Sequence, residues 1–281
     1  MAETCWLVLL SAAYPLWRAW NANRHTSLFQ TIHWAIVAWI AWLWALTPNH
    51  SADAAIPSYV ALSFSACANV AVLGAREPGV SAWNFVILGL LALLFVPVAE
   101  ALFADRALSL GGVRTFFLGA TLAVGLINYL PTRLAPAIVI LFLGCVGEIL
   151  MLARQEGLIE TAFPFAQLSR PLLVASPWVA YLSLAWQPRA RSQADALWLG
   201  FRDRFGLFWG QRLREQFNCS AANSGWPVHL RWQGLRVIQP EKQAPETQSA
   251  IVDVLRALLK RFVFEDVPAV RDSSESERAD A

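Results

Sequence analysis

The sequence predicts an all-α polytopic membrane protein with about seven transmembrane helices and a small C-terminal cytoplasmic domain that is α+β or helical. Three observations predict this. Of the 281 residues, 57% are hydrophobic and only 15% are charged, whereas soluble proteins have about 25% charged residues. Apolar runs of about 20 residues, the length that spans a bilayer, recur along the first two thirds of the chain. Residues 187–281 then hold 14 of the 22 basic side chains and 12 of the 20 acidic ones.

Residues 1–186 form the predicted transmembrane domain. The first apolar run follows an N-terminus without basic residues, so we expect a retained helix rather than a cleaved signal peptide. Two runs, 5–17 and 171–186, are short, and each contains a proline, which a membrane helix tolerates when neighbours satisfy the freed carbonyl. Counting them gives seven spans, and a count of five or six remains open. The longer runs are residues 27–46, 56–75, 81–104, 111–130 and 134–153.

Arginines beside the runs predict the orientation, because cytoplasmic loops are enriched in Lys and Arg. With the N-terminus outside, the seven-span arrangement places these arginines on the cytoplasmic side: Arg18, Arg24, Arg76 and Arg133. It places these outside: Arg106, Arg114, Arg154 and Arg170. The prediction of a plasma (bacterial inner) membrane protein with a cytoplasmic C-terminus therefore depends mainly on the arginines between positions 189 and 204.

Residues 187–270 form the predicted cytoplasmic domain, which begins with an amphipathic helix. Apolar and aromatic residues recur every three or four positions over 193–217, which predicts that helix. "VHLRWQ" (228–233) alternates in the manner of a strand, and "GLRVIQ" (234–239) is its expected hairpin partner. An apolar stripe over 251–262 predicts a second helix. Residues 271–281 have no apolar pattern, and we expect them to be disordered.

The first helix of this domain carries a mixture of arginines and aromatic rings, which predicts a helix lying in the membrane interface. The lipid bilayer and its anionic headgroups are then expected partners, at about 1 kcal/mol per nearby arginine. In the alternative, the aromatic face packs on Leu255, Leu258 and Phe262 of the same domain, and different turns of the helix could serve both roles. The interface residues are Arg202, Arg204, Phe205, Phe208, Trp209, Arg212 and Arg214.

Two glutamates lie within predicted spans, where an ionisable side chain is costly and therefore a functional candidate. Glu100 and Glu148 both fall near the outer ends of their runs, at the level of Arg114 and Arg154. One hypothesis is an intramembrane polar cluster of these four residues that binds a proton, a cation or a polar substrate. The alternative is that the side chains extend to the interface or form structural ion pairs.

Catalytic and metal-binding signatures are absent from the sequence. It contains no HExxH, GxSxG, P-loop or GxGxxG motif. Its cysteines, at positions 5, 67, 145 and 219, form no CxxC pair. We therefore predict no catalytic residue, no metal, no cofactor and no nucleic-acid partner.

The resulting functional prediction is a non-catalytic assembly or interaction protein that docks a small cytoplasmic domain at the membrane. Its expected partner is a second copy of the chain or another membrane protein. A transporter of a small solute, ion or proton that uses the intramembrane glutamates is the alternative. A lipid-modifying membrane enzyme is third, because it would need a site without any of the familiar motifs.

Overall fold

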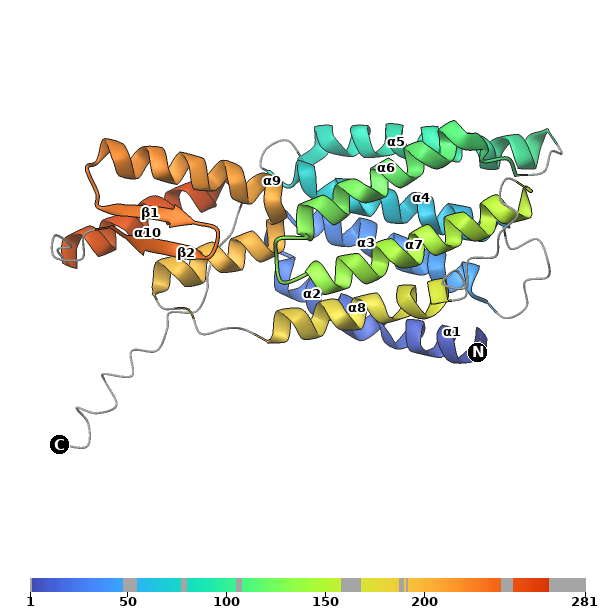
Figure 1. Cartoon of the computed structure of the whole chain (residues 1–281), viewed down its shortest axis with the longest axis horizontal. Helices are drawn as coiled ribbons and strands as arrows, with labels where there is room; N and C mark the ends of the chain where they lie inside the picture. The colour runs from blue at the N-terminus through green and yellow to red at the C-terminus, as the bar shows by residue number, and fades with distance from the viewer. Residues whose placement is uncertain are drawn as a thin grey trace.

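The computed structural model describes residues 2–47, 55–76, 80–104, 108–157, 168–186, 190, 192–238 and 245–262. A long helical bundle and a smaller domain lie end to end along one axis (Figure 1). The bundle holds the N-terminal helices, and the smaller domain contains a two-stranded sheet. A mostly helical chain with a small C-terminal region that includes strands is thus confirmed.

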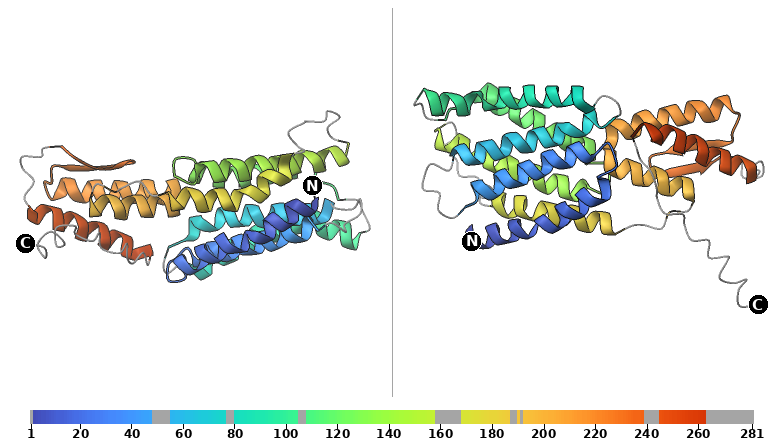
Figure 2. Two further views of the ribbon diagram at one scale, coloured as in Figure 1. Left: turned by 90° about the horizontal axis from the view of Figure 1, so that it is seen from below. Right: turned by 180° about the vertical axis from the view of Figure 1, so that it is seen from behind.

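The bundle is built from long helices, and most helices that follow one another in the sequence run in opposite directions (Figure 2). Among the described residues, four stretches are long and apolar enough to cross a membrane: Ala55–Gly74, Ala82–Phe103, Gly111–Tyr129 and Ala135–Gln155. Phe29–Ala45 is a shorter apolar helix. The elements are α1 (Ala2–Ser11), α2 (Ala13–Asn23), α3 (Phe29–Ala45), α4 (Ala55–Ala71), the 3₁₀ turn η1 (Val72–Gly74), α5 (Val80–Phe103), α6 (Gly111–Tyr129), α7 (Ala135–Gln155) and α8 (Ser169–Ala185).

Helix α4 lies at the centre of the bundle, where it contacts α3, α5, α6 and α7. Its Tyr59 and Cys67 are buried, and the Tyr59 hydroxyl donates to the carbonyl of Leu94 at 2.8 Å. By contrast, α5 is mostly exposed along its length, and apolar side chains such as Phe85 and Leu93 point outward. An apolar surface of this kind suits a lipid environment, because water would penalise it.

The first apolar run departs from the single predicted helix. Helix α1 ends at Ser11 and α2 begins at Ala13, so the run is interrupted at Ala12. Pro15 lies three residues after this break, where its missing N–H cannot donate to the preceding turn. The helical segment then continues to Asn23, beyond the predicted end of the run.

The small domain consists of α9 (Gln193–Asn223), a hairpin of β1 (Val228–Arg231) and β2 (Gly234–Val237), α10 (Pro245–Leu259) and the 3₁₀ turn η4 (Lys260–Phe262). The strands pair antiparallel, with Val228 opposite Val237 and Arg231 opposite Gly234. Alternate residues of β1 are buried, as the sequence alternation predicts. The core is filled by large apolar side chains: Trp198, Phe201, Phe205, Phe217, Leu230, Ile251 and Leu255.

Helix α9 differs most from the sequence prediction, because it reverses direction at Gly206, where φ is 80° and ψ is −164°. Its first half (193–205) approaches the bundle and its second half (207–223) leads away from it (Figure 1). The bend therefore lies at the end of the bundle, where the two parts of the molecule meet.

Candidate functional site

The bend of α9 is fixed to the end of α6 by one buried amide. The backbone of Gly206 adopts a conformation that is almost confined to glycine. A Cβ at this position would overlap the side-chain amide of Asn128. That amide donates from Nδ2 to the carbonyl of Phe205 at 3.4 Å and accepts the amide N–H of Phe208 at 3.1 Å. Asn128 thus satisfies backbone groups that the bend removes from the helical pattern.

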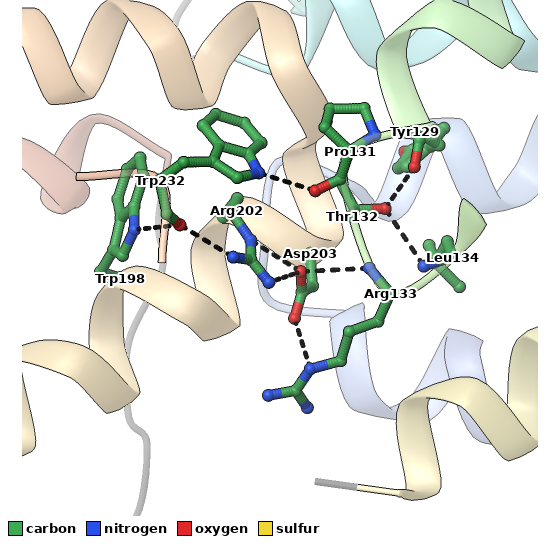
Figure 3. Close-up of polar contacts among 9 residues, drawn as sticks. All are labelled: Tyr129, Pro131, Thr132, Arg133, Leu134, Trp198, Arg202, Asp203 and Trp232. Atoms are coloured by element: carbon green, nitrogen blue, oxygen red, sulfur yellow. Dashed lines mark hydrogen bonds and ion pairs between the residues drawn. The ribbon is translucent and has the colours of Figure 1, made fainter. Parts of the chain in front are cut away.

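A buried carboxylate joins the loop after α6 to the small domain (Figure 3). Asp203 is 3% exposed. Its Oδ1 accepts from Nε and Nη2 of Arg202 at 2.9 and 2.7 Å, and its Oδ2 lies 3.0 Å from Nε of Arg133. One negative charge therefore holds two guanidinium groups, and one of these belongs to the loop between α6 and α7.

Arg133 has a lowered pKa despite this ion pair. Burial is the main cause, the attraction of Asp203 opposes it, and the nearby charge of Arg202 lowers the pKa further. An arginine begins from so high a pKa that it stays charged at neutral pH. We call the place where Arg133 of the bundle meets Arg202 and Asp203 of the small domain the junction. It has two positive charges and one negative charge, and the carboxylate of Asp203 lies between the two cations.

Trp232 extends the same network to the β-hairpin. Its indole Nε1 donates to the carbonyl of Pro131 at 2.7 Å, while its own carbonyl accepts from Arg202 Nη1 at 2.8 Å and from Trp198 Nε1 at 3.2 Å. The guanidinium carbon of Arg202 is also 5.7 Å from the centroid of the Trp232 ring, within the range of a cation–π contact. The turn of the hairpin is therefore tied to the loop between α6 and α7 (Figure 3).

Two further contacts attach the domain to other segments at this end of the bundle. Trp209 donates from Nε1 to the carbonyl of Val72, in the turn that follows α4, at 3.0 Å. Ser27 lies between α2 and α3, and its Oγ is 3.0 Å from the carbonyl oxygens of both Ala75 and Phe262. Three separate segments of the bundle thus contact the domain.

The predicted interface residues divide at the bend. Arg202 and Phe205 are buried inside the small domain. Phe205 stacks on Phe201 with centroids 4.5 Å apart and meets Phe262 edge-on at 5.1 Å, so the packing that the alternative predicted is present here. Arg204, Trp209 and Arg214 are half-buried, whereas Phe208 and Arg212 are exposed. Lipid contact by the residues after the bend stays a prediction.

Arg204 belongs to the junction through its backbone. Its carbonyl accepts the hydroxyl of Tyr129, at the end of α6, at 3.1 Å. Burial lowers the pKa of its guanidinium. The predicted interface helix therefore supplies backbone as well as side-chain contacts to the bundle.

The structure shows two separate ion pairs, rather than one cluster, at the candidate intramembrane residues. Glu100 of α5 and Arg114 of α6 form a bidentate pair, with both N–O distances 2.9 Å. Glu148 of α7 is buried and accepts the Ser169 hydroxyl at 2.6 Å, and the Nε of Arg170 is 3.6 Å away. The structure thus brings Glu100 and Arg114 together and pairs Glu148 with the start of α8. Arg154 is exposed near the end of α7.

The sequence interpretation did not assign Asp203, Trp232 or Ser169 to these sites. Asp203 had a signal, since it is an acid between two arginines in a strongly basic stretch. Trp232 was assigned only to the strand pattern, and its contact with Pro131 joins positions 101 residues apart. Ser169 directly precedes Arg170, but its partner Glu148 is 21 positions away.

Within the described ranges, no group of three His, Cys, Asp or Glu side chains is arranged to hold a metal ion. No protein-family model, curated protein or solved structure matches the chain. At the junction, the ion pairs of Asp203 and the hydrogen bonds of Asn128 and Trp232 fix the small domain on the bundle.

Proposed function

We propose that the chain is a non-catalytic assembly or interaction protein of the membrane, whose bundle holds the small domain in a fixed orientation at the cytoplasmic surface. The observation that carries this proposal is the burial of Asp203 between Arg133 of the bundle and Arg202 of the domain. We propose that this buried charge network specifies the orientation of the domain, a role that such networks have in some proteins even where they add little net stability. A domain that served only as a loose appendage would not require one.

The proposal includes seven spans, formed by α1 with α2 and by each of α3 to α8. Ser27, Val72 and Arg133, which come after helices α2, α4 and α6, all contact the small domain. They therefore lie at one end of the bundle, as an alternating path through the membrane requires. Arg24, Arg76 and Arg133 flank the same spans, and their positive charge supports a cytoplasmic location for this end.

A second copy of the chain or another membrane protein would bind the exposed surface of the domain. Phe208, just after the bend, is 44% exposed, and Ile238, after β2, is 63% exposed. We propose that both side chains belong to one contact surface, because contiguous exposed apolar patches mark sites of protein interaction. The fixed orientation of the domain would present Phe208 near the bilayer, within reach of a membrane partner.

The test is photo-crosslinking of the full chain in its native membrane. A photoreactive amino acid replaces Phe208, and the control carries it at the exposed Gln216 on the same helix. We expect a discrete adduct, with a second copy or another membrane protein, from position 208 only. The same weak, heterogeneous products from both positions would contradict an assembly role for this surface.

One observation favours a transporter as the second candidate. The carboxylate of Glu148 is buried within the bundle, beside a serine hydroxyl and the guanidinium of Arg170, and such groups mark ion or proton pathways in many membrane proteins. The discriminating measurement is proton and ion flux into vesicles that contain the purified chain. The assembly role predicts no flux above that of empty vesicles. Flux that is lost in Glu148→Gln and kept in Glu215→Gln would establish transport instead.

A further inference from the structure

A shallow, open groove of about 600 Å³ lies on the small domain between the second half of α9 and β1. Its volume falls within the range of small-molecule sites. One wall consists of α9 residues that share a helical face, and the other consists of the outward side chains of β1 and its turn. The lining residues are Gln211, Arg214, Glu215, Asn218, Cys219, His229, Arg231, Trp232 and Gln233.

Asn218 fixes the two walls relative to each other. Its side-chain amide accepts the N–H of Leu230 at 2.7 Å and donates to the carbonyl of Leu230 at 3.1 Å. It therefore pairs with the free edge of β1 as a neighbouring strand would. The groove is a built feature of the domain, because these bonds hold α9 against the strand.

The groove presents two arginines from opposite walls, Arg214 from α9 and Arg231 from β1. Neither guanidinium forms an ion pair with another residue in the part of the chain that the structure describes. The one carboxylate of the lining, Glu215, accepts a hydrogen bond from Gln211. Two planar guanidiniums that face one groove match the oxygens of a phosphate group.

One end of the groove lies at the junction with the bundle. Trp232 lines it, and the indole of Trp232 donates to the carbonyl of Pro131 between α6 and α7. Arg231 directly precedes Trp232 in the sequence. Arg214 lies one helical turn after Gln211, which is the α9 residue of the groove nearest the bend. Both arginines therefore lie toward this end of the groove. A tryptophan beside arginines at a membrane surface is a typical headgroup environment.

We propose that this groove binds the phosphate of an anionic lipid headgroup, with Arg214 and Arg231 as its ligands. The inference rests on the proposed function, because it requires the domain to lie against the cytoplasmic face of the bilayer. It places lipid recognition on a defined pair of arginines, one of which, Arg231, lies outside the basic-aromatic helix.

The test uses the full chain in detergent, titrated with phosphatidylglycerol or with phosphatidylcholine, and counts retained lipid by native mass spectrometry. The groove variant is Arg214→Gln with Arg231→Gln. The matched control is Arg256→Gln with Arg261→Gln, which removes the same charge from exposed positions outside the groove. We expect one retained phosphatidylglycerol in the native chain and the control. Binding to the groove variant should be weaker by about fivefold for each arginine, or about 25-fold for both.

Cys219 supplies a second readout, because it is an exposed free thiol that lines the groove. Phosphatidylglycerol should slow its alkylation in the native chain and in the control, but not in the groove variant. Equal loss of lipid in both double variants would overturn the proposal in favour of diffuse charge. Equal binding of phosphatidylcholine would also overturn it. If inorganic phosphate at the same concentration as phosphatidylglycerol displaces the lipid, the site prefers a soluble phosphate compound and the lipid assignment is wrong.

Failure of this proposal is distinguishable from failure of the proposed function. The crosslink at Phe208 reports on the assembly role and does not depend on the groove arginines. A chain that gives the crosslink but shows no lipid selectivity would keep the assembly role and lose the headgroup site.

Discussion

At Asp203, a single carboxylate separates two guanidinium groups inside the junction. Replacing Asp203 by Asn keeps the shape of the side chain and removes its charge. Arg133 and Arg202 would then face each other with no negative charge between them. Breaking one partner out of a buried charge network costs about 3–5 kcal/mol. We therefore expect Asp203→Asn to lower the thermal stability of the full chain and to increase hydrogen exchange in residues 193–262.

The matched control for Asp203 is Asp253→Asn. Asp253 pairs with Arg256 at 3.7 Å on the exposed surface of α10. Exposed pairs of this kind contribute about 0–1 kcal/mol, so this variant should behave like the native chain. Similar losses in both variants would mean that general surface charge, rather than the junction, stabilises the domain.

At Gly206, the constraint is on the shape of the backbone rather than on charge. An alanine would have to adopt φ near 80°, at a cost of about 1–3 kcal/mol, and its Cβ would overlap Asn128. We expect Gly206→Ala to release α9 from α6, which would appear as faster proteolysis of the full chain near the bend. Gly119→Ala is the control, since a Cβ there meets no atom within 4 Å. Unchanged proteolysis in Gly206→Ala would show that the bend tolerates a side chain.

At the scale of the element, hydropathy predicted the four long candidate spans because length and apolar content are local properties of a sequence. The same reasoning predicted the strands from the alternation of Val228 and Leu230 with polar residues. It could not predict the reversal of α9. Apolar residues continue at helical spacing through both halves, and periodicity carries no information on the φ angle of Gly206.

The role of Gly210 illustrates the same limit. Gly206 and Gly210 have the GxxxG spacing that lets two helices approach closely in membranes. The structure uses Gly206 for the bend, and Gly210 lies against Trp232, whose ring would be 3.0 Å from an added Cβ. Of the candidate site residues, the sequence identified Glu100 and Arg114, whose positions near neighbouring span ends suggested proximity. The partnership of Glu148 with Arg170 depends on the packing of α7 against α8.

The hairpin provides a prediction at this scale. Asn218 covers the free edge of β1 at the fully buried Leu230. Asn218→Ala should leave both backbone groups of Leu230 without these partners, and an unsatisfied buried polar group costs about 1–3 kcal/mol. We expect faster hydrogen exchange across residues 228–237. Ser220→Ala, which removes only an exposed bond to Gln216, should change stability by less than about 0.5 kcal/mol. Equal protection of the hairpin in both variants would contradict the role of Asn218.

At the scale of the whole molecule, the junction joins parts of the chain that are far apart in sequence. Ser27 and Phe262 are separated by 235 positions, yet the amide of Ser27 donates to the carbonyl of Phe262 at 3.2 Å. The small domain therefore depends on the assembled bundle for its orientation. Among the described residues, these three attached segments connect the bundle to the domain by hydrogen bonds and an ion pair.

The last prediction concerns the side of the membrane on which the small domain lies, and it tests the whole arrangement. The reporter Cys219 is exposed on the small domain, and Gln155 is exposed at the end of α7, which Figure 1 places at the far end of the bundle. In a Cys5→Ser background, a membrane-impermeant maleimide should label a Gln155→Cys variant in intact cells and should label Cys219 only after permeabilisation. The buried Cys67 and Cys145 should react slowly in both cases. Labelling of Cys219 in intact cells would place the domain outside, and the arginines at the junction would then contradict the positive-inside distribution.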